Sequence, residues 1–152
     1  MRKRVLPPTA KKVAMNTCCK VNAAIRNQAV CSIDTYVDSG EAILTDKVKQ
    51  LSKEWDTERF FEANAASCVL LSSIIGLQKK NSYWFAFTGT IGSFLLLHAL
   101  QGWCPSLPLI RKLGVRTAEE IFQEKTVYKM LRGDFAQNTN DADELLKIAE
   151  KE

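Results

Sequence analysis

Two stretches without a formally charged residue lie close together in the middle of this chain, and they constrain its fold more than any other feature. Residues 63–78 carry no charge, and a second uncharged stretch runs from Tyr83 to Ile110. With Phe60 and Phe61 added, the first stretch would rise about 28 Å as a helix, and the helix from Trp84 to Trp103 would rise about as far. Both lengths match the hydrocarbon core of a bilayer, which is roughly 30 Å thick.

The alternative is a soluble all-α domain that hides both segments in its core. A chain of 152 residues with 46% hydrophobic residues has the composition of an average globular protein, so composition alone does not decide. One domain of this size seldom has to bury two adjacent helices that are apolar nearly all round. We therefore expect an all-α protein built on a transmembrane helical hairpin with flanking amphipathic cytoplasmic helices.

The positive charges indicate how such a hairpin would be oriented. Only Lys79 and Lys80 occupy the turn, whereas the other basic residues lie before the first span and after the second. By the positive-inside rule we expect both termini in the cytoplasm and the turn outside, with Trp84 and Trp103 as anchors at the two membrane interfaces. The net charge of +4 is too small and too dispersed to indicate nucleic-acid binding.

The rest of the chain is predicted to form helices that flank the hairpin. No proline or glycine interrupts residues 41–75, so we expect the helix that carries Leu44, Val48 and Leu51 on one face to run straight into the first span. We interpret residues 32–40 as a linker. The predicted organisation is a basic N-terminal segment with a short amphipathic helix (1–38), a charged helix leading into the span (39–59), the transmembrane hairpin (60–110, spans about 60–78 and 83–103), a cytoplasmic helix (111–135) and an acidic tail (136–152).

Association of the two spans is predicted to depend on small residues, because lipid provides little hydrophobic drive between helices. In an antiparallel pair with a tight turn, Ser72 would meet Gly89, and Cys68 would meet Ser93. The same small residues can equally serve a homodimer, so a homo-oligomer through the spans stays open. The helix-packing residues that we expect are Ser72, Gly76, Gly89, Gly92 and Ser93.

Five cysteines and a single histidine provide few groups for catalysis. The cysteines form no C-x-x-C pair, and with only His98 beside them we expect no metal site and no cofactor. Cys104, predicted to be accessible at the cytoplasmic membrane edge, is the one candidate thiol. It follows a helix C-terminus, which disfavours a thiolate, so we expect a structural residue. His98, the polar residue inside the second span, is expected to be neutral, and either to bond a facing serine or a carbonyl or to reach interfacial water.

The order of the segments and several short motifs resemble the YgaP-like inner-membrane domain family of bacteria. The motifs are the KK turn, "LQGWCP" at residues 100–105, "LGVRT" at residues 113–117 and "LRGDF" at residues 131–135. Arg59 resembles an arginine that is common in that family, whereas Ala63 stands where a glycine is often found. The resemblance covers residues 55–135. It implies a two-helix hairpin in the bacterial inner (cytoplasmic) membrane, with unknown biochemical activity.

Three hypotheses about function follow. The leading one is a small integral inner-membrane protein that is not an enzyme and acts as a non-catalytic scaffold or interaction module, in contact with the lipid bilayer and an unidentified cytoplasmic protein. The alternative is a membrane partner in sulfur or thiol chemistry through Cys104, because the resemblance includes relatives fused to rhodanese sulfurtransferase domains. The third is a soluble helical interaction domain. We interpret the tripeptide Arg132-Gly133-Asp134 as a helix end that coincides with an adhesion motif.

Overall fold

A computed structural model of the chain describes residues 6–136 and 142–150, and all regular secondary structure in these residues is helical. The predicted all-α fold class is therefore confirmed. In chain order the elements are η1 (Thr9–Lys11), α1 (Lys12–Met15), α2 (Cys19–Tyr36), α3 (Glu41–Lys53), α4 (Thr57–Lys79), α5 (Ser82–Gln101), α6 (Leu107–Lys112), α7 (Ala118–Arg132) and α8 (Ala142–Glu150).

These helices belong to two compact units, each built from two separate stretches of the chain. We call the first the hairpin unit; it comprises Met1–Asn22 and Trp55–Ala118 and contains α1, α4, α5 and α6. We call the second the helical unit; it comprises Ala23–Glu54 and Glu119–Glu152 and contains α3, α8 and most of α2 and α7. Each unit has a buried apolar cluster of its own.

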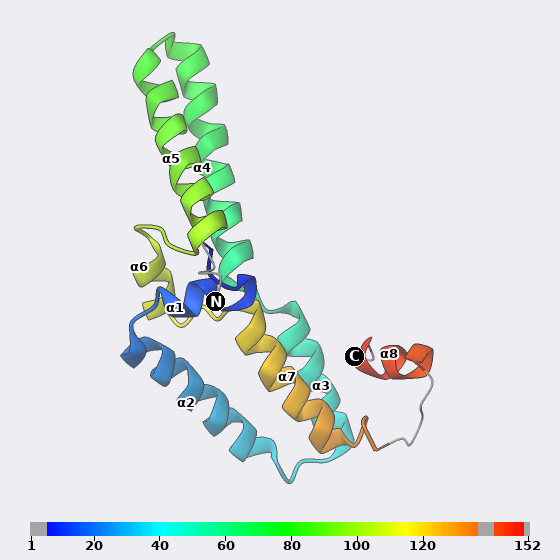
Figure 1. Ribbon diagram of the computed structural model, residues 1–152. Helices are drawn as coiled ribbons and strands as arrows, with labels where there is room; N and C mark the ends of the chain where they lie inside the picture. Colours follow the sequence, from blue (N-terminus) through cyan, green and yellow to red (C-terminus); the bar gives the residue numbers. More distant parts are fainter. Residues whose placement is uncertain (1–5, 137–141, 151–152) are drawn as a thin grey trace. The chain divides into compact units, whose positions relative to one another are not determined.

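The hairpin unit is dominated by α4 and α5, which run antiparallel beside each other (Figure 1). The turn between them is short because Lys80 adopts a left-handed conformation, with φ of 48°, directly after α4. Asn81 then accepts a hydrogen bond from the backbone N–H of Tyr83 at 3.0 Å and so caps the start of α5. The lysine pair predicted to form the turn does lie there, with Lys79 as the last residue of α4.

The start of α4 differs from the prediction of one helix running through residues 41–75. α3 ends at Lys53, and α4 begins after Asp56, whose carboxylate accepts a hydrogen bond from the backbone N–H of Arg59 at 2.7 Å. An aspartate in this N-cap position satisfies a free donor at the helix end, which stabilises a new helix start without any proline or glycine. The single-helix prediction was wrong because it searched only for helix breakers and overlooked a helix cap.

Small residues of α4 and a seam of α5 form the contact between the two helices. The Ser72 Oγ and Thr88 Oγ1 atoms are 2.7 Å apart, one residue from the predicted pairing of Ser72 with Gly89. Gly76 lies so close to α5 that a Cβ added to it would be 3.0 Å from the Trp84 Cβ. Ala65, Ser72 and Gly76 are all buried, so the small face of α4 is the one that contacts α5.

The predicted packing residues of α5 face elsewhere. Gly89, Gly92 and Ser93 are exposed, and a Cβ added to either glycine would meet no atom within 4 Å. Cys68, which was predicted to face Ser93, is exposed as well. The expectation that these residues hold the two spans together was wrong. A small-xxx-small pattern permits close approach of two helices but does not decide which face of the helix makes the contact. Here the face of α5 that contains Thr88 contacts α4, through the hydrogen bond between Thr88 and Ser72.

A disulfide crosslink should report this register. In a background without native cysteines, the pair Ser72→Cys and Thr88→Cys should oxidise to an intrachain disulfide, because the two oxygens that the sulfurs replace are in contact. The matched control is Ser72→Cys with Gly92→Cys, because a Cβ added to Gly92 would meet no atom within 4 Å. Mass spectrometry of non-reduced peptides measures both yields. Equal yields in the two variants would show that the register or the facing side is different.

The helical unit is held together by α2, α3 and α7. Its buried cluster joins α3 and α7, and side chains of α2 pack against it; the cluster is Leu44, Val48, Leu51, Ile121 and Tyr128, flanked by Ile33 and Tyr36. Ser32 and Tyr128 also share a hydrogen bond of 2.8 Å between their hydroxyl oxygens. Residues 32–36, which were predicted to be linker, therefore belong to α2, and only residues 37–40 separate α2 from α3.

Within the described residues, two helices are long and apolar enough to cross a membrane, and they are α4 and α5. Much of their apolar surface lies open. Leu70 and Leu77 of α4 are 61% and 69% exposed, and Leu96 of α5 is 60% exposed. Small and polar residues thus form the contact between α4 and α5, and large apolar side chains lie on the outside of the pair.

Candidate functional site at the base of the helix pair

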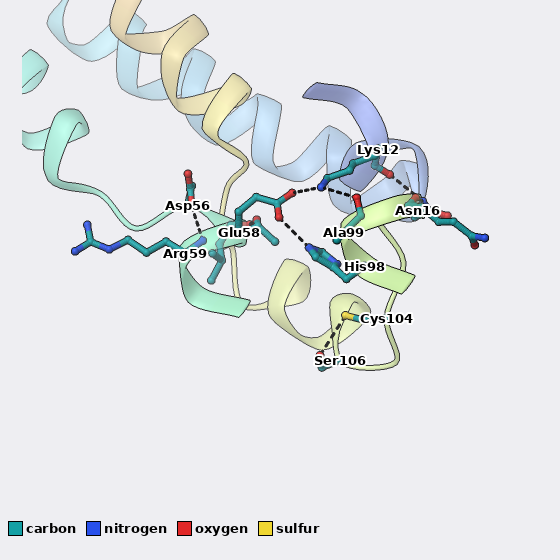
Figure 2. Close-up of polar contacts among 12 residues, drawn as sticks. Lys12, Asn16, Asp56, Glu58, Arg59, His98, Ala99, Cys104 and Ser106 are labelled. Carbon is teal, nitrogen blue, oxygen red and sulfur yellow. Dashed lines mark hydrogen bonds and ion pairs between the residues drawn. The ribbon is translucent and has the colours of Figure 1, made fainter. Parts of the chain in front are cut away.

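Three ionisable side chains from separate helices meet where α4 begins and α5 ends (Figure 2). The Glu58 carboxylate lies between the other two: its Oε1 is 3.3 Å from the Lys12 Nζ, and its Oε2 is 3.2 Å from the His98 Nε2. An ionised carboxylate only accepts hydrogen bonds, so His98 donates through Nε2. We call Lys12, Glu58 and His98 the base triad.

Local structure explains why these residues meet. Glu58 lies in the first turn of α4, two residues after the Asp56 cap, and His98 lies in the last turn of α5. Because the helices are antiparallel, these two turns lie at the same end of the pair. The Phe61 ring, one turn after Glu58, packs on the imidazole with 4.2 Å between ring centroids. His98 is only 1% exposed, and α1 supplies Lys12 from outside the pair.

His98 and Lys12 favour the ionised form of Glu58, which precedes the predicted first span. The hydrogen bond from His98 lowers the pKa of the Glu58 carboxyl, partial burial opposes this effect, and the charge of Lys12 lowers the pKa further. Glu58 is therefore ionised at neutral pH. Its stabilising contribution is present above its pKa in the unfolded chain and is lost as the pH falls through the lowered folded pKa.

The partner of His98 was not the one expected from the sequence. A facing serine, a carbonyl or interfacial water was predicted, but the Glu58 carboxylate accepts the hydrogen bond of the imidazole. Glu58 and Lys12 were missed because the predicted register pairs only residues of the two spans that lie at the same depth. Both residues lie outside the predicted spans and reach His98 or its partner through long side chains. The signal that could have identified Glu58 is an acidic residue in the first turn of an otherwise apolar helix.

Cys104 lies close by, in the loop that follows α5, and its thiol is completely buried. Its Sγ is 3.3 Å from the Ser106 Oγ (Figure 2), and it belongs to the buried cluster of the hairpin unit with Val13, Phe61 and Leu107. The prediction that this thiol is accessible was wrong. The chain turns back after Gly102, and α6 packs into the same buried cluster through Leu107 and Ile110.

The remaining predicted residues have no polar role in this site. Trp84 lies half-buried in the first turn of α5, and Trp103 lies after the last turn, 43% exposed. The two indoles thus mark opposite ends of α5. Among the residues that the structure describes, no group of three His, Cys, Asp or Glu side chains is placed to hold a metal ion.

Comparisons of this chain with protein-family models, with curated proteins and with solved structures find no significant match. The similarity to YgaP-like domains stays a prediction from the sequence motifs.

Proposed function

We propose that this chain is a small integral membrane protein in which α4 and α5 cross the bilayer as a hairpin. The observation that supports this proposal most directly is the exposure of the two apolar helices. Core helices of a soluble protein are mostly buried, whereas α4 and α5 bury little of their apolar windows. In water an exposed apolar surface of this extent would favour association or aggregation. In a bilayer the same surface would make favourable contacts with the lipid tails.

The proposed location is the bacterial inner (cytoplasmic) membrane, with two passes and both termini in the cytoplasm. The orientation is supported by the basic residues at the open ends of the hairpin, such as Arg59 and Arg111, against only two lysines in its turn. The membrane type is supported by the motif resemblance to YgaP-like domains. Trp84 and Trp103, at opposite ends of α5, fit the two interfaces.

The proposed biochemical role is that of a non-catalytic scaffold or interaction module. The helical unit would bind a cytoplasmic protein, and its surface presents large apolar side chains suited to this: Phe122, Met130 and Phe135 are exposed by 65%, 61% and 46%. Within the membrane, Gly89, Gly92 and Ser93 on the open side of α5 would let a second copy approach closely. A homo-oligomer through the spans is part of this proposal.

Alkaline carbonate extraction tests the membrane proposal. We expect the expressed full-length chain to stay in the membrane pellet after carbonate washing, because two apolar spans of this length are held by the hydrocarbon core. A peripheral protein from the same membranes, released by the wash, and a known integral protein, retained in the pellet, are the controls. Release of this chain into the supernatant would reject the proposal and favour the soluble helical domain.

The second candidate function is sulfur or thiol chemistry through Cys104. It is favoured by the position of this thiol in the same buried cluster as Phe61, which packs on His98. The thiol has no exposed surface, so this function requires a movement that uncovers it. A Cys104→Ser variant that leaves a sulfur-related phenotype unchanged would remove this candidate.

A further inference from the structure

The N-terminal segment of the hairpin unit covers the loop that carries Cys104. Val13 is the buried residue of α1, only 2% exposed, and it packs into the cluster with Cys104, Leu107 and Ile110. The neighbouring Met15 is 66% exposed. α1 therefore contributes one apolar side chain to this core and otherwise lies on its surface.

Polar contacts hold α1 against the end of α5. The Lys12 Nζ donates to the Ala99 carbonyl at 3.3 Å in addition to its ion pair with Glu58 (Figure 2). The Asn16 Nδ2, just after α1, donates to the Gln101 carbonyl at 2.8 Å. The last carbonyls of a helix lack partners within the helix and carry partial negative charge. An ammonium and an amide group from α1 thus complete the C-terminal end of α5.

The fit between α1 and the chain just before Cys104 is tight at Gly102. A Cβ added to Gly102 would lie 2.6 Å from the backbone carbonyl carbon of Lys12, closer than real Cβ contacts allow. Gly102 also has φ of 73°, the left-handed conformation that ends α5. This glycine therefore serves two purposes, since it stops the helix and leaves room for the backbone of α1.

From these contacts we propose that α1 is a lid over the Cys104 thiol, which opens while α4 and α5 stay paired. A helix of four residues has little stability of its own, and isolated ion pairs of partly exposed side chains contribute little. The lid is held by Val13 and a few polar contacts, whereas α4 and α5 contact each other directly through Ser72 with Thr88 and through Gly76 with Trp84. Opening the lid exposes the loop of Cys104 to small thiol reagents. This inference concerns the hairpin unit alone and goes beyond the scaffold function.

Thiol labelling tests the lid in the full-length chain. Cys18, Cys19, Cys31 and Cys68 are replaced by serine, so that Cys104 is the remaining thiol, and its reaction with N-ethylmaleimide is followed by mass spectrometry in detergent. We expect Val13→Asp to accelerate labelling by about tenfold or more, because a carboxylate is not tolerated in this apolar cluster and the lid opens. Met15→Asp, the same change at an exposed position of the lid, should leave the rate unchanged.

Two further variants keep the test decisive if Val13→Asp disturbs folding. Lys12→Ala with Asn16→Ala removes the side-chain contacts of this segment with α4 and α5 without touching the apolar cluster and should also accelerate labelling. Gly102→Ala should do so more than Gly114→Ala, because both glycines have positive φ but only Gly102 contacts Lys12. Retention of helical content by circular dichroism shows that the pair is intact. Unchanged labelling in the Lys12/Asn16 double variant would overturn the lid, as would labelling of the parent as fast as that of a chain whose one cysteine is the exposed Cys31.

Discussion

Replacing Asp134 by alanine should destabilise the helical unit by about 3 kcal/mol, because it leaves a buried guanidinium without its counter-ion. The side chains of Arg132 and Asp134 are 2% and 3% exposed. Two hydrogen bonds join them: the Arg132 Nε donates to Oδ1 at 2.9 Å and Nη2 donates to Oδ2 at 2.5 Å. The Asp134 carboxylate accordingly raises the pKa of Arg132. The third arm of the guanidinium donates to the Thr45 Oγ1 at 2.9 Å and so ties α7 to α3.

Hydrogen exchange of the full-length chain measures this effect. Amides of α3 and α7 in the Asp134→Ala variant should lose protection, while amides of α4 and α5, which belong to the hairpin unit, should keep theirs. Asp46→Ala removes an acid from an exposed position of α3 and should change the local free energy of opening by less than about 0.5 kcal/mol. Equal protection in the two variants would show that the ion pair contributes no more than a surface contact.

This ion pair also explains the RGD tripeptide. Gly133 adopts a left-handed conformation with φ of 86°, and the backbone N–H of Asp134 donates to the Lys129 carbonyl at 3.1 Å, as at many helix ends. Asp134 is buried, whereas a motif for adhesion has to present its aspartate to a partner. The sequence correctly predicted that Gly133 ends the helix. It did not predict that the two flanking charges bind each other, because that depends on the turn geometry the glycine creates.

The sequence predicted the fold class and the two apolar helices because both depend on local patterns. Helix geometry and the pattern of charges are enough to predict the two uncharged segments and the turn at Lys79 and Lys80. They also predict the approximate residue of α5 that Ser72 faces. The contact face of α5 did not follow from the same patterns. Thr88, not Gly89, faces α4, and the pattern of small residues contains no information about a hydrogen bond to a side chain on the other helix.

The candidate site depended still more on contacts between distant parts of the chain. The docking of α1 brings Lys12 to the Glu58 carboxylate that also binds His98, and no local pattern describes this docking. Cys104 was expected to be accessible because it follows the end of the second predicted span, at the cytoplasmic membrane edge. Pro108 lies in the first turn of α6, where proline is tolerated, and α6 packs against the loop of Cys104. The burial of Cys104 thus depends on how α6 packs against it, which local sequence patterns do not describe.

A charge placed in the middle of α4 should decide whether the exposed apolar surface faces lipid. We expect Leu70→Asp to prevent stable insertion, because an aspartate near the centre of a span costs about 3 kcal/mol on insertion scales. Leu70 is 61% exposed, so in a soluble domain the same substitution would alter stability by less than about 0.5 kcal/mol. The measurement is the fraction of the protein that stays in the carbonate-washed membrane pellet.

The helical unit provides a matched control for this substitution. Leu146 of α8 is 58% exposed, nearly the same as Leu70, and lies outside both proposed spans. Leu146→Asp should leave the protein in the pellet, and Leu70→Ala should do so as well, since it shortens the side chain without adding charge. The two substitutions are the same, and the two leucines are exposed to nearly the same extent. A difference in membrane retention between the variants therefore reports whether α4 is surrounded by lipid. Equal retention of Leu70→Asp and Leu146→Asp would mean that the open face of α4 does not contact the hydrocarbon core.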